Sequence, residues 1–317
     1  MILWIIGAGG LLGSALGRVA AERSLPVITS RGVPWSDAEA TVEAIEADAR
    51  RLRETLESNA GDSQTWGIVW AAGHATTAST EDETAVELET FENSLTAIRS
   101  VMTGIPGGTF ALASSAGGVY AGSAHPPFDS STDPMPLGAY GRLKLAQEQA
   151  AAALLGPVMG VVIARIANLY GPGQDLGKLQ GLISRLALTS VTKEPLTMFV
   201  PLDTLRDYIT TDDAAERLMH WIARNSGYVD TRVIASGQAT SLGYLINLMK
   251  DITRVTTPIA SGMHASAAYQ SGDLRLVPDT DDAINSMPLT PLPAGIKVVY
   301  EDILWRSMYG RDASQWH

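Results

Sequence analysis

The 317-residue sequence contains no cysteine, so disulfide bonds, thiolate nucleophiles and cysteine-ligated metals are all excluded. Its five histidines are scattered without the spacing of metal ligands, and we expect no metal site. Basic residues (23) are fewer than acidic residues (34), and the net charge of -11 argues against a nucleic-acid or anionic-membrane surface. No apolar run approaches membrane-spanning length and no basic leader is recognisable, so we expect a cytoplasmic protein.

Apolar residues are plentiful, and their arrangement indicates an α/β fold. They make up 45% of the chain, enough for a large core in one domain or in two closely associated lobes. Short apolar runs typical of buried parallel strands alternate with stretches expected to be helical, and this alternation decays beyond residue 173 into proline-punctuated segments. The expected strands lie at residues 2–6, 25–28, 66–70, 110–113 and 158–164, and the expected helices at 14–20, 36–58, 87–102 and 139–155.

A glycine-rich turn follows the first expected strand and leads directly into a helix. Its spacing is G-x-x-G-x-x-G, whereas the common dinucleotide fingerprint G-x-G-x-x-G fails because a leucine occupies its last glycine position. Backbone amides at such a turn can bind a pyrophosphate, so the pattern predicts nucleotide binding, with a tight turn made for packing as the alternative. The residues concerned are Gly7, Gly10, Leu11, Leu12 and Gly13.

The end of the second expected strand favours NADP over NAD. A carboxylate there would bind the ribose hydroxyls of NAD, but no acid is present and Ser30 and Arg31 could accept a 2′-phosphate instead. An exposed loop arginine is the alternative interpretation of Arg31. Asp48, on the following helix, is a candidate adenine ligand.

A tyrosine and a lysine one helical turn apart carry the predicted chemistry. Tyr140 and Lys144 share one face of a helix, where the ammonium can favour the anionic form of the phenol and so make it an acid/base. Ser114 and Ser115 end the strand expected at residues 110–113, at the edge of a parallel sheet where ligands bind. We therefore expect a serine, Tyr140 and Lys144 to meet in the fold.

In this order along nearly the whole chain, the motifs resemble the extended short-chain dehydrogenase/reductase family of nucleotide-sugar epimerases, dehydratases and ketoreductases. The two late blocks at residues 170–174 and 206–208 distinguish its extended members from shorter ones. The residues that carry the resemblance are the three glycines of the turn, Ala71 and Ala72, Asn93, residues 114–120, Tyr140 and Lys144 with Glu148, residues 165–174, and residues 206–209 with Asp212 and Asp213.

The resemblance implies a Rossmann-like doubly wound parallel sheet that binds NAD or NADP, and a smaller C-terminal α/β lobe that closes over a nucleotide sugar. The implied NAD(P)-binding domain covers residues 1–170, with 205–236 returning to it, and the implied substrate lobe covers 171–204 and 237–317. Ala71, Ala72 and Asn93 would line the cofactor. The resemblance also suggests a homodimer formed by the helices around Asn93 and Tyr140.

Roles are carried over to matching positions. Tyr140 would exchange the proton of a sugar hydroxyl, Lys144 would bind the nicotinamide ribose, and Ser115 would hydrogen-bond the reacting oxygen. Asn168 and Arg206 would approach the substrate diphosphate, with a structural ion pair to Asp207 or Asp212 as the alternative for Arg206.

The chain departs from the family pattern at three places. Ala116 and Gly117 follow Ser115 where many dehydratases carry an acid pair, so dehydration is not expected. Gln270 stands where a second phosphate-binding arginine is often found, and Arg275 is displaced beyond it. The glycines at 117–118 shift the register of Ser115, which leaves Ser114 as a substitute.

These features favour an NADPH-dependent ketoreductase that reduces a 4-keto nucleotide sugar. A nucleotide-sugar 4-epimerase, which uses the same three residues and retains NAD, is the second hypothesis. A non-catalytic dinucleotide sensor of the same fold is the third, because a fold does not determine a function.

Overall fold

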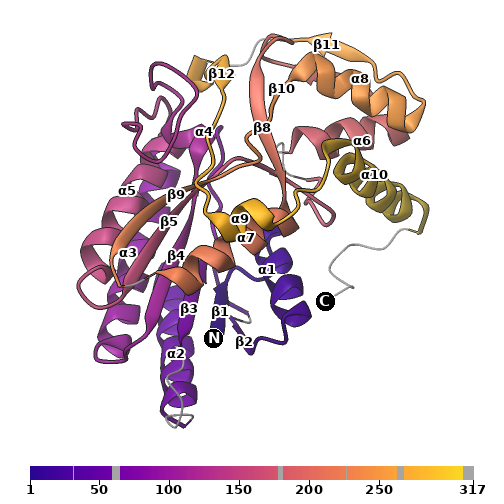
Figure 1. The fold of residues 1–317 in the computed structure, drawn as a ribbon. Helices are drawn as coiled ribbons and strands as arrows, with labels where there is room; N and C mark the ends of the chain where they lie inside the picture. The colour runs from indigo at the N-terminus through magenta and orange to yellow at the C-terminus, as the bar shows by residue number, and fades with distance from the viewer. Residues whose placement is uncertain (31, 59–64, 178–180, 226, 263–267, 310–317) are drawn as a thin grey trace.

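The computed structural model describes residues 1–30, 32–58, 65–177, 181–225, 227–262 and 268–309. Its largest element is a six-stranded, wholly parallel sheet in the order β2-β1-β3-β4-β5-β9 (Figure 1). The apolar runs form it because parallel strands are covered on both faces. The strands are β1 (Ile2–Ile6), β2 (Val27–Thr29), β3 (Trp66–Trp70), β4 (Gly108–Ser115), β5 (Gly160–Ile166) and β9 (Val229–Ile234).

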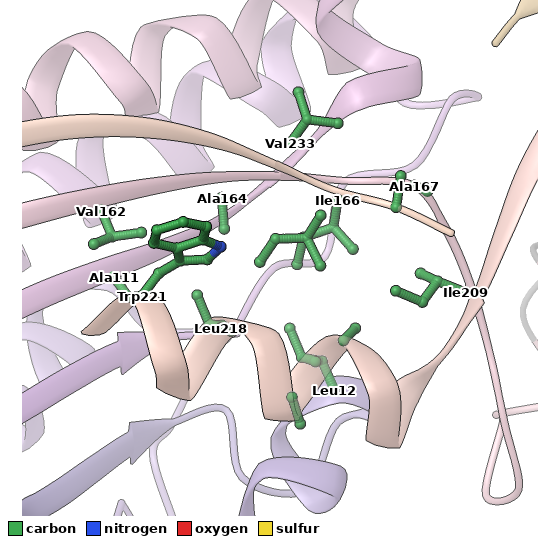
Figure 2. Packing of buried hydrophobic residues seen from close by; sticks show 14 of the residues in the cluster. Leu12, Ala111, Val162, Ala164, Ile166, Ala167, Ile209, Leu218, Trp221 and Val233 are labelled. Atoms are coloured by element: carbon green, nitrogen blue, oxygen red, sulfur yellow. The ribbon is translucent and has the colours of Figure 1, made fainter. Parts of the chain in front are cut away.

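Helices cover both faces of this sheet, which confirms the predicted Rossmann-like fold. Side chains of β1 alternate between the two cores: Leu3 and Ile5 face one, and Trp4 and Ile6 face the other. The first core lies under α1 (Leu11–Glu22) and α7 (Thr211–Arg224), as Figure 2 shows around Trp221. The second lies under α2 (Ala38–Ser58), α3 (Glu81–Met102) and α5 (Ala139–Leu155).

The C-terminal part has smaller sheets and its own core. β8 (Leu205–Thr210) pairs with β6 (Asn168–Tyr170), β10 (Ala239–Ser241) and β12 (Asp273–Leu274), while β7 (Leu196–Met198) pairs with β11 (Ile259–Ser261). The helices are α6 (Leu182–Thr192), α8 (Leu242–Thr253) and α10 (Leu292–Tyr309), and two short helices, α4 (Ala116–Val119) and α9 (Asp282–Ser286), lie in connections. Among the described helices, none has the length and apolar character needed to cross a membrane.

The chain passes repeatedly between the two parts. β8 lies in the smaller sheet, but α7 follows it directly and packs against α1, and β9 then joins the edge of the parallel sheet. The predicted domain boundaries, with residues 205–236 returning to the first domain, stay a prediction.

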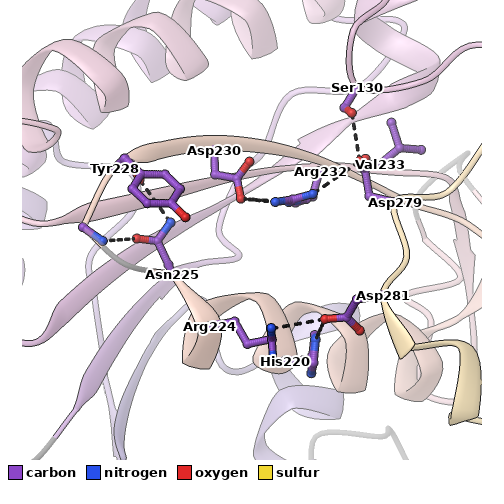
Figure 3. A network of polar contacts seen from close by, with 11 residues as sticks. Ser130, His220, Arg224, Asn225, Tyr228, Asp230, Arg232, Val233, Asp279 and Asp281 are labelled. Carbon is purple, nitrogen blue, oxygen red and sulfur yellow. Dashed lines mark hydrogen bonds and ion pairs between the residues drawn. The ribbon is translucent and has the colours of Figure 1, made fainter. Parts of the chain in front are cut away.

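A segment that we call the strap, residues 273–290, runs from β12 past the free edge of the parallel sheet at β9 to α9 and beyond (Figures 1 and 3). Asp279 accepts hydrogen bonds from Ser130 Oγ (2.9 Å) and Val233 N (2.7 Å). Asp281 lies 2.8 Å from His220 Nε2 and caps the start of α9. The strap therefore joins the C-terminal part to β9 and α7.

Several predicted elements begin a few residues away from their expected positions, and two of these shifts have a clear physical cause. The helix expected from residue 87 begins at Glu81, because Thr80 and Glu83 form a reciprocal capping box with distances of 3.3 and 2.9 Å. The second strand begins at Val27 rather than at residue 25, since Pro26 has no N–H for the ladder and contributes only its carbonyl, to Leu3 N.

One buried carboxyl gives the fold a pH dependence. Asp207 on β8 is 1% exposed, and its Oδ1 accepts from Ser236 N (2.8 Å) and Ser236 Oγ (3.0 Å). Burial raises the pKa of Asp207 from 3.8 to about 6. Since the folded-state pKa lies above the unfolded value, the stabilising contribution is present below about pH 4 and is lost as the pH rises through about 6.

We expect Asp207→Asn to remove this loss. Between pH 4 and pH 7 the stability of the variant relative to wild type should rise by up to about 3 kcal/mol, because the amide keeps an acceptor for Ser236 and carries no charge to bury. Urea unfolding at the two pH values measures the change. Asp203→Asn, at an exposed aspartate, is the control, and equal pH responses of both variants would contradict the assignment.

Candidate active site

The glycine turn forms a cradle without side chains before α1. Gly7 has a φ of +87°, and a Cβ there would lie 2.7 Å from Ala72 N, while a Cβ at Gly13 would lie 2.1 Å from the Gly7 carbonyl oxygen. Gly10 provides no side-chain cap to α1, so first-turn amides remain available to an anion. Leu12, which breaks the common fingerprint, is buried in the core under α1 (Figure 2). The cradle fits a pyrophosphate.

A cation that sequence reasoning missed lies at the end of β2. Arg51 on α2 donates to the Thr29 carbonyl (3.0 Å) and pairs with Asp48 (2.9 Å), so the predicted adenine ligand Asp48 is already engaged. Ser30 Oγ accepts from Trp4 Nε1 (2.9 Å) and keeps its own O–H as a donor. Arg31 lies outside the described residues.

The two serines at the end of β4 have different environments. Ser114 is buried and donates to Glu148 Oε1 (2.5 Å). Ser115 is half-buried, and its Oγ accepts from Gly118 N (3.1 Å) at the start of α4. The hydroxyl hydrogen of Ser115 is left to donate to a ligand, whereas that of Ser114 is committed to a carboxylate.

Tyr140 lies close to the short turn that Ser115 begins. A Cβ at Gly118 would lie 3.1 Å from Tyr140 Cε1, so the absence of a side chain there lets the phenol ring approach the turn. Lys144 Nζ lies 5.9 Å from the centroid of the same ring and donates to Gln147 Oε1 (3.0 Å). Lys144 is buried, and that single bond leaves it further N–H donors for a ligand.

A buried ion pair joins the helix that carries Tyr140 to the neighbouring strands. Arg165 Nη2 lies 2.8 Å from Glu148 Oε2, and Arg165 Nη1 donates to the Tyr120 hydroxyl (2.8 Å). Burial raises the pKa of Tyr120, so the phenol stays protonated and donates to the Asp129 carbonyl (2.6 Å). Through Ser114, which donates to Glu148, the network links β4, α5, β5 and the loop at Asp129.

The C-terminal part places a buried cation on β8. Arg206 is 7% exposed, donates to the Leu205 carbonyl (2.8 Å), and has its pKa lowered by burial. The alternative of an ion pair with Asp207 or Asp212 is wrong, because Asp207 bonds Ser236 and Asp212 pairs with Arg18. No carboxylate of the described residues lies within ion-pair distance of Arg206.

The other predicted diphosphate ligands are partly occupied. Asn168 is exposed, and its Nδ2 donates to the Asp207 carbonyl (2.9 Å). Arg275 Nε lies 3.1 and 3.0 Å from the two oxygens of Asp273, so that carboxylate holds the displaced arginine. A cavity of about 270 Å³ lies beside β8, between residues 199–204 and 270–272.

The residues predicted to line the cofactor lie on α3 and directly after β3. Asn93 is exposed on α3, and its cofactor contact stays a prediction. Ala71 and Ala72 follow β3 and touch the glycine cradle, because the Cβ position of Gly7 meets Ala72.

In the described part of the chain, no group of three or more histidines and acids is arranged to hold a metal ion.

Glu87 is a second residue that sequence reasoning missed. Its Oε2 accepts from His74 N (2.9 Å) and Ala75 N (2.8 Å), just after β3. No sequence pattern indicates this contact, because it depends on how α3 lies against a loop.

Known proteins resemble this chain in sequence and in fold. The sequence model of the NAD dependent epimerase/dehydratase family matches residues 3–234. A dTDP-L-rhamnose 4-epimerase of Burkholderia thailandensis is 30% identical over 146 residues, which cover 45% of this chain and 39% of that protein. A dTDP-4-dehydro-6-deoxyglucose reductase of Escherichia coli is 30% identical over 141 residues, 44% of each chain. The matched region spans less than half the length of these curated relatives.

Solved structures share the fold at low sequence identity. The UDP-glucose 4-epimerase of Thermotoga maritima has a TM-score of 0.78 at 19% identity, covering 97% of this chain and 99% of that one. An epimerase of Methanothermobacter thermautotrophicus has a TM-score of 0.76 at 17% identity, covering 98% and 94%. Both therefore contain the parallel sheet and the C-terminal part together.

The cradle predicts a sharp contrast between two glycines of α1. Gly13→Ala should weaken binding of a dinucleotide at least tenfold, because its methyl group would collide with the Gly7 carbonyl and open the turn. Gly17→Ala, where a Cβ meets nothing within 4 Å, should bind normally and gain about 0.5–1 kcal/mol of stability. Titration calorimetry and thermal unfolding measure both, and a Gly13→Ala protein with wild-type affinity would contradict the cradle.

Proposed function

The chain belongs to the NAD dependent epimerase/dehydratase family, and from that membership we propose that it reduces a 4-keto nucleotide sugar with NADPH. It is an NAD(P)-dependent enzyme of the extended short-chain dehydrogenase/reductase type. The observation that carries the proposal is the approach of Tyr140 to the turn begun by Ser115, with Lys144 beneath the phenol ring.

The chemistry follows from these three side chains. A nicotinamide cofactor, when bound at this site, would supply the hydride. Tyr140 donates its hydroxyl proton to the carbonyl oxygen, and Ser115 donates a hydrogen bond to the same oxygen while Gly118 N holds the serine in place. Lys144 would hold the nicotinamide ribose with the donors that Gln147 does not use, and its charge would stabilise the phenolate left after proton transfer.

The absence of a neighbouring acid supports reduction over dehydration. The residue after Ser115 is Ala116, which is fully buried, and the Cβ position of Gly117 meets only Leu274 within 4 Å. Neither position can supply the acid/base pair that elimination of water requires.

Arg206 supports an anionic substrate. A buried guanidinium that has no carboxylate partner is costly unless an anion pairs with it, and a diphosphate is such an anion. We assign the diphosphate first to Arg206 and Asn168, and place the nucleoside in the adjoining cavity. Arg275 is a second candidate, because it must leave Asp273 to take part.

Cofactor choice rests on the end of β2. Thr29 and Ser30 carry no carboxylate, Ser30 retains a donor, and Arg51 reaches the Thr29 carbonyl. A dianionic 2′-phosphate suits such a site better than a neutral ribose diol does. The homodimer through α3 and α5 and the cytoplasmic location stay predictions.

A 4-epimerase with retained NAD is the second candidate, because one similar protein is a dTDP-L-rhamnose 4-epimerase and another is a dTDP-4-dehydro-6-deoxyglucose reductase. The same tyrosine and serine would serve both reactions. What differs is whether the cofactor leaves after each turnover.

Nucleotide analysis of the purified protein separates the two. As a reductase, the protein should carry little nucleotide and should oxidise added NADPH when a 4-keto sugar nucleotide such as dTDP-4-dehydro-6-deoxyglucose is supplied. Stoichiometric retained NAD, with interconversion of 4-epimers and no net NADPH consumption, would reverse the ordering.

Replacing the phenol tests the chemistry. Tyr140→Phe should lower kcat between about 100-fold and 10,000-fold, because the ring remains but the transferable proton is gone. The cofactor dissociation constant should stay within about twofold of wild type. Tyr228→Phe, at an exposed tyrosine on the far edge of the sheet, is the matched control, and full turnover by Tyr140→Phe would remove the catalytic assignment.

A further inference from the structure

Glu87 has one oxygen in use and one without a partner. Its Oε2 accepts the two amides at His74 and Ala75, which fixes the carboxylate against the loop after β3. Its Oε1 is buried and has no hydrogen-bond partner among the described residues. Leaving a buried acceptor unpaired costs free energy. A ligand that donates a hydrogen bond to this oxygen would remove that cost.

The unpaired oxygen and the Lys144 ammonium face the same point. A Cβ at Gly73 would lie 3.1 Å from Glu87 Oε1 and 3.7 Å from Lys144 Nζ. Gly73 is exposed and follows Ala71 and Ala72, where the chain meets the glycine cradle. The carboxylate and the ammonium form no direct ion pair, yet two atoms this near to one point lie within roughly 7 Å of each other, a gap that a bridging diol can span.

We propose that Glu87 is a ligand of the nicotinamide ribose, sharing its diol with Lys144; this rests on the proposed function, in which Lys144 binds that ribose. An ammonium only donates and a carboxylate only accepts, whereas a hydroxyl does both. One ribose hydroxyl accepts from Lys144, and the diol donates to Glu87 Oε1. The charge-assisted bond gives the buried oxygen its missing partner.

The other charged groups around Lys144 are already paired. Glu148 binds Arg165, and Arg142 pairs with Glu81 at the surface. The side chain of His74 belongs to an exposed residue, and only its backbone amide contacts Glu87. Among the described residues, Glu87 is thus the carboxylate that is free to accept a hydrogen bond from the same diol to which Lys144 donates.

A simple loop cap is the competing explanation, and Glu87→Gln distinguishes the two. The glutamine oxygen still accepts from His74 N and Ala75 N, but an amide group that only donates replaces Oε1. The probes are ADP-ribose, which carries the second ribose, and ADP, which lacks it, with their 2′-phosphorylated counterparts used for an NADP-selective protein. Titration calorimetry gives both dissociation constants.

We expect Glu87→Gln to weaken ADP-ribose about tenfold and to leave ADP within about twofold of wild type. Glu89→Gln removes the same charge from an exposed position of α3 and should change neither constant. An unchanged ADP-ribose constant, or equal weakening of both ligands, would assign Glu87 to loop capping alone. Failure of the wild-type protein to bind either ligand would instead overturn the proposed function.

Discussion

The buried ion pair between Glu148 and Arg165 is the interaction on which the site depends. Each charge is removed from water, and removing one partner of such a pair typically costs about 3–5 kcal/mol because the other is left uncompensated. The pair engages Ser114, and so separates it in role from Ser115, and it holds Tyr120 against the Asp129 carbonyl. One electrostatic anchor thereby orders strand, helix and loop around the phenol.

Electrostatics inside the site run opposite to those of the whole protein. The chain carries a net charge of -11, yet Lys144 and Arg206 are buried cations. Among the described residues, neither forms an ion pair with a carboxylate, and Glu148 near Lys144 pairs with Arg165 instead. Cations in a low-dielectric pocket attract an anion more strongly than they would at the surface. An acidic exterior also keeps nonspecific polyanions away. This contrast is consistent with the proposed binding of a small phosphorylated ligand.

Local sequence patterns predicted most helices and strands, but they could not predict which side chains from different elements come into contact. β1, β3 and α5 have the expected bounds because their apolar runs and glycine stops are encoded within a few residues. The sequence could not distinguish the roles of Ser114 and Ser115, because the difference depends on a contact between Ser114 on β4 and Glu148 on α5. Arg51 and Glu87 were missed for the same reason: sequence spacing cannot locate their helices against the backbone that they contact, the end of β2 for Arg51 and the loop after β3 for Glu87.

The strap and the return of the chain through α7 and β9 have an evolutionary consequence. The smaller sheet is built from β6, β8, β10 and β12, and the chain passes through α7 and β9 of the parallel sheet between β8 and β10, so no contiguous segment encodes the smaller sheet alone. Recombination cannot exchange the C-terminal part of the molecule as a block without also replacing α7 and β9. Point changes and loop insertions, by contrast, leave the shared folding unit intact.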